Sequence, residues 1–167
     1  MRDIRVLHVD DDPNFAELTG KFLEQESEQF QVVTETHASN ALDRLTESDE
    51  KIDCILSDYA LPDINGIEFL EQVRTEYPEL PFILFTGKGS ESVAGDALSC
   101  GATDYLQKRG GAEQYALLAN RIQNAVTQYR DRQERELSER YRLKLYEITS
   151  DPALEFEEKV ERLLEPG

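Results

Sequence analysis

The sequence predicts an α/β fold in which helices cover both faces of a doubly wound, five-stranded parallel sheet. Short apolar runs alternate five times with segments of helical periodicity, and the connections between them are short. Such connections imply right-handed crossovers between parallel strands. A long helical segment follows the fifth run, so we expect one α/β domain with a C-terminal helical extension.

The expected strands are short runs rich in Ile, Val, Leu and Phe. The third and fourth runs are continuously apolar, which is typical of strands covered on both faces. The five runs are residues 4–9, 30–35, 52–57, 81–85 and 103–106.

Segments with helical spacing lie between these runs. Residues 13–27 begin with Pro, which favours the first turn of a helix. Apolar residues recur on one face of this segment, namely Phe15, Leu18, Phe22 and Leu23. The same spacing predicts helices in 40–48, 66–77 and 92–101.

Residues 112–148 contain neither Gly nor Pro and predict one helix of roughly 55 Å, at about 1.5 Å per residue. Its first part carries a stripe that can dock on the sheet: Tyr115, Leu118, Ile122, Ala125 and Tyr129. A second stripe follows a charged stretch and consists of Leu137, Tyr141, Leu145 and Ile148. This second stripe needs a partner, and we expect a homodimer contact.

Residues 150–167 predict a short helix, with Ser150 or Asp151 as its cap and Pro152 in its first turn. Since this helix exposes an apolar face, we expect it to begin a further domain. The predicted organisation is an α/β domain at 1–125, a signalling or coiled-coil helix at 126–149, and the start of a truncated following domain at 150–167.

The composition restricts the partners. The 167 residues include 35 acidic and 18 basic ones, and the formal net charge is -17. This charge repels nucleic acid phosphates and anionic membranes, so we expect neither as a partner. It also fits a salt-adapted host, in which the Debye length is roughly 3 Å at 1 M salt. An ordinary acidic protein is the alternative.

The chain is expected to be cytoplasmic. No run approaches the roughly 20 apolar residues of a membrane span, and the N-terminus lacks the apolar core of a signal peptide. Cys54 and Cys100 are far apart and belong to no metal-binding motif, which favours core residues in a reducing compartment.

Polar residues follow four of the expected strands. Asp10 and Asp11 end the first strand and Asp58 follows the third, while Thr86 and Lys108 follow the fourth and fifth. In doubly wound sheets the ligand crevice lies beyond the carboxyl ends of the strands. These side chains are therefore expected to converge on one rim.

The carboxylates at this rim require a cation. If they lie roughly 5 Å apart, each pair repels by about 3 kcal/mol at an effective dielectric near 20. Mg²⁺ offsets such repulsion and coordinates phosphate, so a phosphoryl group could transfer to Asp58. Asp12 has an equally good alternative role as the cap of the helix that begins at Pro13.

Residues 1–125 resemble the receiver domain of two-component response regulators, which has a flavodoxin-like (βα)5 fold. The motifs that carry the resemblance are "VDDD" at 9–12, "LSDYALPDINGIEFL" at 56–70, "FTG" at 85–87 and "DYLQK" at 104–108. The resemblance implies a signal receiver with Mg²⁺-dependent self-phosphorylation and self-dephosphorylation chemistry, served by a sensor histidine kinase.

The resemblance also implies roles for individual residues. Asp58 would accept the phosphoryl group, and Thr86 and Lys108 would contact it. Asp10, Asp11, Asp58 and the backbone carbonyl of Ala60 would hold Mg²⁺. Tyr105 matches the aromatic switch residue of the family, although a buried aromatic of the fifth strand is an alternative interpretation.

The chain departs from the family pattern in the loops after the fourth and fifth strands. Arg109 follows the lysine where the family usually has Pro, often in a cis peptide, so the loop geometry there is open. Gly87 replaces a small alanine. The Gly-rich segment after it suggests that Lys88 adds a further positive charge near the phosphoryl group.

Two other functions are alternatives to the receiver. An aspartate-nucleophile phosphatase needs a second acid two residues after the nucleophile, where Ala60 stands. A phosphorylation-independent dimeric scaffold would use only the helix. Residues 140–165 are similar to the joint between receiver and GAF domains in archaeal signalling proteins, so a GAF-like domain is expected to follow.

Overall fold

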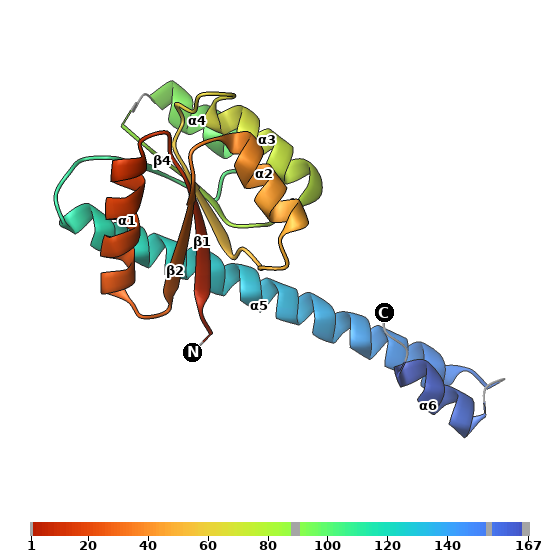
Figure 1. The fold of residues 1–167 in the computed structure, drawn as a ribbon. Coiled ribbons are helices and arrows are strands. Elements are labelled where there is room, and N and C mark those ends of the chain that lie inside the picture. The colour runs from red at the N-terminus through yellow and green to blue at the C-terminus, as the bar shows by residue number, and fades with distance from the viewer. Residues whose placement is uncertain (1, 88–90, 153–154, 165–167) are drawn as a thin grey trace. The chain divides into compact units, whose positions relative to one another are not determined.

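A computed structural model describes residues 2–87, 91–152 and 155–164. Its first compact unit, residues 1–129, contains a five-stranded parallel sheet with the strand order β2-β1-β3-β4-β5 (Figure 1). The strands are β1 (Ile4–Val9), β2 (Phe30–Glu35), β3 (Cys54–Ser57), β4 (Phe82–Thr86) and β5 (Asp104–Gln107). The predicted doubly wound, flavodoxin-like fold is confirmed.

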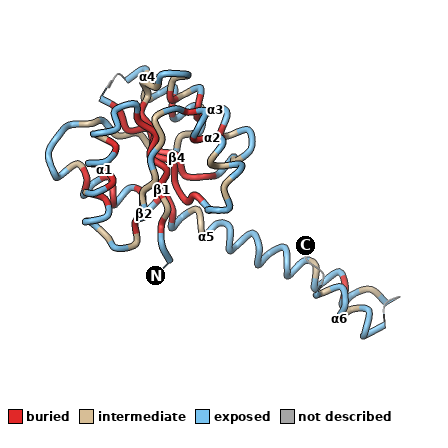
Figure 2. Tube along the Cα trace, viewed as in Figure 1, coloured by how far each residue is buried: buried red, intermediate tan, exposed pale blue. Residues whose placement is uncertain are grey.

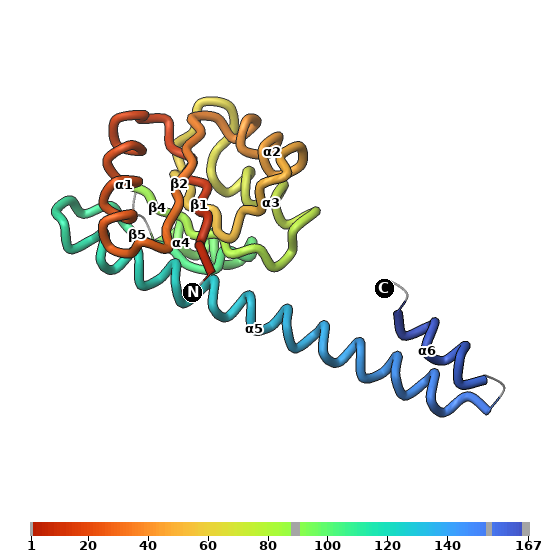
Figure 3. Tube along the Cα trace, turned by 60° about the horizontal axis from the view of Figure 1, so that its bottom comes forward, coloured from red at the N-terminus to blue at the C-terminus, as the bar shows by residue number. Residues whose placement is uncertain are grey.

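The helices are α1 (Pro13–Glu26), α2 (Ala38–Glu47), α3 (Gly66–Glu76), α4 (Glu91–Ser99), α5 (Glu113–Ser150) and α6 (Phe156–Leu164). Helices α1 and α3 lie on opposite sides of the strands (Figure 3). In the described part of the chain, no helix combines the length and the apolar character of a membrane span.

The core has two layers, one on each face of the sheet. In one layer, Leu23 of α1 and Leu118 and Ile122 of α5 pack against Val6 and Leu56. In the other, residues of α2, α3 and α4 pack against Leu7 and Ile55. The central strands β1, β3 and β4 are almost entirely buried between these layers, whereas the edge strands β2 and β5 are partly exposed (Figure 2). The rigid two-sided core fixes the carboxyl ends of the strands, where the loops begin.

The first part of α5 docks as its apolar stripe predicted. Tyr115, Leu118, Ile122 and Ala125 are buried, and Tyr129 is partly buried against the core. These residues recur at helical spacing, so they fall on one face of the helix.

The second compact unit comprises residues 130–167 and contains the rest of α5 together with α6. Leu137, Tyr141 and Leu145 are exposed, as the second stripe predicted. Ile148 departs from the expectation that the whole stripe faces solvent, because it is only 5 % exposed within the described residues.

The expected start of the last helix is wrong. Ser150 is the last residue of α5, and α6 begins at Phe156 rather than after a Ser150 or Asp151 cap. The hydroxyl of Thr149 donates to the carbonyl of Leu145 at 2.7 Å, a bond that Thr makes inside a helix rather than at a cap. Local capping residues alone do not reveal that α5 extends through them.

Candidate functional site at the carboxyl ends of the strands

Strand register brings the predicted site residues together. Val9 of β1 pairs with Ser57 of β3, so Asp10 and Asp58 are the next residues on adjacent strands. The amide of Asp58 donates to the carbonyl of Val9 at 2.9 Å. These two strands lie where the chain order of the sheet reverses, which is the usual place for a ligand crevice.

Thr86 and Lys108 reach the same rim from β4 and β5. Thr86 pairs with Gln107 in the register, and the amide of Lys108 donates to the carbonyl of Thr86 at 2.9 Å. Thr86 is buried and ends β4. The four predicted strand ends therefore form one continuous edge.

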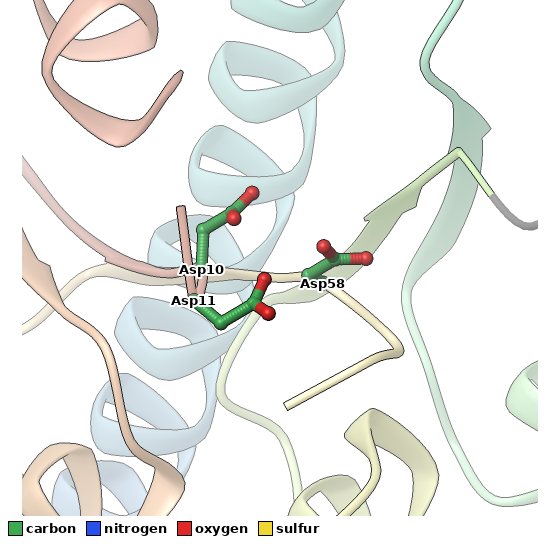
Figure 4. Close-up of side chains that lie close together, drawn as sticks. All are labelled: Asp10, Asp11 and Asp58. Carbon is green, nitrogen blue, oxygen red and sulfur yellow. The ribbon is translucent and has the colours of Figure 1, made fainter. Parts of the chain in front are cut away.

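Three carboxylates gather at this edge. One oxygen from each of Asp10, Asp11 and Asp58 lies within 4.8 Å of the others. The side chains reach into the same small space from the ends of two neighbouring strands (Figure 4). Asp10 and Asp58 are buried, while Asp11 is exposed, so an ion could enter from the side of Asp11.

Asp10 is held on both of its carboxylate oxygens. Oδ1 accepts from the amide of Asp12 at 2.9 Å, and Oδ2 accepts from Nζ of Lys108 at 2.7 Å. Burial raises the pKa of Asp10, and these two hydrogen bonds oppose that rise without cancelling it. The carboxylate is thus fixed in orientation but costly to keep charged.

Lys108 bridges two of the carboxylates. Its Nζ donates to Oδ2 of Asp10 at 2.7 Å and to Oδ2 of Asp58 at 3.1 Å. Burial alone would lower the pKa of Lys108, but hydrogen bonds and charge from the two aspartates outweigh burial and raise it. The ammonium therefore offsets the repulsion between the buried carboxylates.

Backbone contacts fix the loop that carries Asp58. Oδ1 of Asp58 accepts from the amide of Tyr59 at 2.7 Å, and the carbonyl of Tyr59 accepts from the amide of Gly66 at 2.7 Å. A Cβ on Gly66 would lie 2.4 Å from the carbonyl oxygen of Asp58. Only glycine lets α3 begin this close to the Asp58 backbone.

Asp12 has the capping role that was one of its two interpretations. Its side chain accepts from the amides of Asn14 and Phe15, at 3.0 and 3.2 Å. Pro13 occupies the first turn of α1, where its missing N–H costs nothing. Asp12 therefore starts α1, while its two acidic neighbours face the rim.

Ala60 and Tyr105 lie around this centre. Ala60 is half-buried in the loop after Asp58. Tyr105 packs against the core layer of α2, α3 and α4, and its hydroxyl is buried without a hydrogen bond among the described residues. This position is compatible with both interpretations of Tyr105, as a switch and as a core aromatic.

The loop after β5 shows how Arg109 replaces the usual Pro. The Lys108–Arg109 peptide is trans, and Gly110 and Gly111 have φ of 78° and 82°. The amides of Arg109 and Gly110 donate to Oε1 of Gln114, at 3.0 and 3.2 Å. The N–H that Arg109 supplies and Pro lacks thus helps to tie the loop to α5. Lys88 lies outside the described residues.

Two residues beside Lys108 were not among the predicted site residues. His8 is fully buried on β1, and burial, with the charge of Lys108, lowers its pKa to about 3. Phe15 of α1 places its ring 4.2 Å from Nζ of Lys108. Because side chains alternate along a strand, His8 lies on the same face as Asp10, and this alternation could have identified His8 from the sequence. Phe15 had been assigned only to the core-facing stripe.

The donor set fits a hard divalent cation. Carboxylate oxygens are the ligands that Mg²⁺ prefers, and three of them converge here with one exposed side. Among the described residues, this is the acidic group whose geometry suits a metal ion. When bound, such an ion would supply positive charge next to Asp58.

The fold and this acidic site together define a signal receiver domain. The chain belongs to the family of response regulator receiver domains, because the model of that family matches residues 6–120. This classification confirms the resemblance seen in the sequence motifs and places the protein in two-component signalling.

Curated relatives agree with this assignment. The chain is 38 % identical over 105 residues to the two-component response regulator ORR26 of rice (Oryza sativa subsp. japonica), which covers 63 % of the chain and 18 % of the relative. It is 26 % identical over 133 residues to the response regulator SaeR of Staphylococcus aureus, covering 80 % and 56 %. The chain thus spans only part of the length of these relatives.

Solved structures are similar over the receiver unit. A receiver domain protein from Clostridium thermocellum has a TM-score of 0.68 at 26 % identity, covering 76 % of this chain and 97 % of the other. A CheY-like receiver domain protein from Methanospirillum hungatei has a TM-score of 0.67 at 27 % identity, covering 78 % and 98 %. Both cover nearly the whole of the solved receiver.

Proposed function

We propose that the receiver accepts a phosphoryl group on Asp58 from a sensor histidine kinase, in a reaction that requires Mg²⁺. An oxygen of Asp58 forms the new bond to phosphorus while the phosphorus–nitrogen bond of the donor phosphohistidine breaks. The observation that carries the proposal is the convergence of Asp10, Asp11 and Asp58 within 4.8 Å of one another, beside Lys108.

The proposed role of each site residue follows from the chemistry of its side chain. Asp10, Asp11, Asp58 and the carbonyl of Ala60 would hold Mg²⁺, whose charge would reduce the repulsion between the Asp58 carboxylate and the incoming phosphoryl group. Lys108 then contacts the phosphoryl oxygens with its ammonium, and Thr86 contacts them with its hydroxyl. The position of Lys108 between two carboxylates supports this role.

The proposed output runs through the face around α4 and α5. Thr86 and Tyr105 shift on phosphorylation, and the change passes into α5 and the signalling helix of residues 126–149. Phosphorylation-dependent repacking of this kind biases a two-state element. The buried hydroxyl of Tyr105, which has no hydrogen bond among the described residues, supports a second arrangement of this side chain.

Phosphorylation of Asp58 is testable directly. Incubation with acetyl phosphate and Mg²⁺ should add one phosphoryl group per wild-type chain, detected as a mass increase of the intact protein. An Asp58→Asn variant should stay unmodified, and omission of Mg²⁺ should abolish labelling. An unmodified wild-type chain, or equal labelling of the Asn variant, would refute the proposal.

A phosphatase is the weaker alternative. Ala60 stands two residues after Asp58, and a methyl group cannot act as the acid that protonates a leaving group. A dimeric scaffold that ignores phosphorylation is disfavoured because it leaves the acidic rim without a purpose. Steady turnover of phosphate esters would favour the phosphatase over the receiver.

The proposed assembly is a homodimer through the C-terminal helix. Leu137 is 53 % exposed and Tyr141 is 60 % exposed, on one face of α5. A solved receiver that is 28 % identical, with a TM-score of 0.65 and covering 75 % of this chain and 98 % of the other, is described as a beryllofluoride-activated NtrC4 receiver domain dimer. We further propose that the protein is cytoplasmic and that its host is a salt-adapted haloarchaeon. A GAF-like domain is proposed to follow α6.

A further inference from the structure

Lys108 lies beside two aromatic rings as well as two carboxylates. Its Nζ is 4.2 Å from the ring centre of Phe15 and 5.9 Å from that of Phe85. The two rings are 6.0 Å apart, with an angle of 34° between their planes. An ammonium within about 6 Å of an aromatic face is attracted by the negative charge of that face.

Local sequence places Phe15 at this position. Asp12 caps α1, and its carboxylate accepts from the amide of Phe15 at 3.2 Å. This bond fixes the first turn of α1, from which the Phe15 ring reaches Lys108. The ring also contacts His8 at a centroid distance of 6.3 Å, so it rests on the buried face of β1.

The present partners of Lys108 are the carboxylates that would hold the metal. Nζ donates to Oδ2 of Asp10 and of Asp58, and both residues belong to the acidic group. A divalent cation bound there would draw on the same carboxylates and repel the ammonium. The face of Phe15 attracts the ammonium without competing for the metal.

We propose that Phe15 is a positioning residue that keeps the Lys108 ammonium at the rim while a divalent cation occupies the carboxylates. The inference rests on the proposed metal and phosphoryl site and adds to it the residue that retains Lys108 there. Phe85 supports the ring of Phe15 from β4. A further carboxylate at the position of Phe15 would also attract the ammonium, but the metal ion would compete with the ammonium for that carboxylate. The aromatic face attracts the ammonium without binding the metal.

The test compares Phe15→Leu, which removes the aromatic face, with Phe15→Tyr, which keeps it. Phe22→Leu is the matched control, because Phe22 also lies on α1 but stacks on Tyr115 at 4.6 Å. The first readout is the rate at which an acylating reagent modifies Lys108 in the Mg²⁺-loaded protein, followed by peptide mass spectrometry. Acylation requires an accessible, neutral amine.

In Phe15→Leu, we expect Lys108 to react roughly threefold to thirtyfold faster than in the wild type, in line with the strength of an ammonium–aromatic contact. Phe15→Tyr and Phe22→Leu should react at the wild-type rate. Equal rates in Phe15→Leu and wild type, or the same acceleration in Phe15→Tyr as in Phe15→Leu, would overturn the proposal.

The second readout is the affinity for beryllofluoride in the presence of Mg²⁺. Beryllofluoride mimics a phosphoryl group, so a displaced ammonium should weaken its binding in Phe15→Leu by a similar factor and leave Phe15→Tyr near wild type. A loss as large in Phe22→Leu would instead indicate a packing effect and would count against the proposal. Acylation needs no phosphoryl transfer, so its outcome is independent of whether Asp58 is phosphorylated.

Discussion

Nζ of Lys108 lies 2.7 Å from Oδ2 of Asp10, and this contact joins the ends of β5 and β1 across the intervening strands β3 and β4. The two residues are 98 positions apart in the sequence. The pair neutralises the buried carboxylate before any metal binds. The ammonium and a metal ion are therefore alternative sources of positive charge for the same aspartates.

Replacing Lys108 by Met should make stability depend more strongly on Mg²⁺. Without divalent cations, the free energy of unfolding should fall by roughly 3 kcal/mol, because a buried carboxylate loses its partner. Saturating Mg²⁺ should restore more stability to the variant than to the wild type. Urea unfolding with and without Mg²⁺ measures both values, and an equal loss in the two conditions would contradict this reasoning.

Replacing Gly66 by Ala should disturb the loop of Asp58. The new Cβ would lie 2.4 Å from the carbonyl oxygen of Asp58, and relief requires backbone movement that costs about 1–3 kcal/mol. Phosphorylation by acetyl phosphate should slow as well. Gly95→Ala is the matched control, because its Cβ would meet nothing within 4 Å and alanine favours the interior of α4. Similar effects of both substitutions would show that the close approach of Gly66 is unimportant.

The charge of Asp63 should stabilise the fold except at strongly acidic pH. Burial is the largest single influence and raises the pKa of Asp63, but hydrogen bonds from backbone amides, among them those of Ser39 and Ala38, together outweigh it and lower the pKa from 3.8 to about 2. Since the pKa in the folded state is below that in the unfolded state, its contribution is complete above about pH 4. The contribution is lost as the pH falls through the folded value.

The Asp63→Asn variant tests this sign. Its free energy of unfolding should be lower than that of the wild type at neutral pH, and the difference should shrink between about pH 4 and pH 2. Urea unfolding over this pH range gives the comparison. A difference that is constant, or that grows toward low pH, would exclude the capping role of the Asp63 charge.

The acidic composition should make the fold more stable in strong salt. With a net charge of -17, screening reduces repulsion within the folded chain. The melting temperature should therefore be higher in about 1 M KCl than at low salt. A variant with Glu26, Glu28 and Glu76, all exposed, replaced by Lys should respond less. A melting temperature that is independent of KCl would remove the argument for a salt-adapted host.

The exposed stripe of α5 should control the oligomeric state. Replacing both Leu137 and Leu145 by Glu should shift the chain toward the monomer, because charges would face each other in the proposed dimer. Leu143 and Tyr146 are also exposed but lie off the stripe, so the same double replacement there is the control. Light scattering at high protein concentration distinguishes the two. A wild-type chain that is monomeric under these conditions would rule out the dimer.

The start of α2 is a helix boundary that the local sequence pattern did not predict. The sequence predicted a helix at 40–48, whereas α2 spans Ala38–Glu47. His37 at its N-cap makes no capping hydrogen bond through its side chain. The cap comes from Asp63, which accepts from the amide of Ala38 at 3.1 Å across 25 residues. No local signal marks a helix that is capped from another loop.

The alternation of strands and helices and the position of the rim illustrate what local patterns do reveal. Apolar runs and helical periodicity are properties of neighbouring residues, so they predicted the alternation of strands and helices. The rule that ligands bind beyond the carboxyl ends of such strands then indicated Asp10, Asp58, Thr86 and Lys108. The predicted third strand began at residue 52 rather than at Cys54, because apolar character does not mark where sheet pairing starts.

The sequence by itself thus determined the fold class, the family and the edge of the sheet where the acidic residues meet. Only the tertiary structure decided which groups touch there: Lys108 between two carboxylates, Phe15 over the ammonium, and Gly66 against the Asp58 backbone. These contacts join segments that are far apart in the chain. They depend on strand register and on how α1 and α3 pack against the sheet, which the spacing of residues along one segment does not specify.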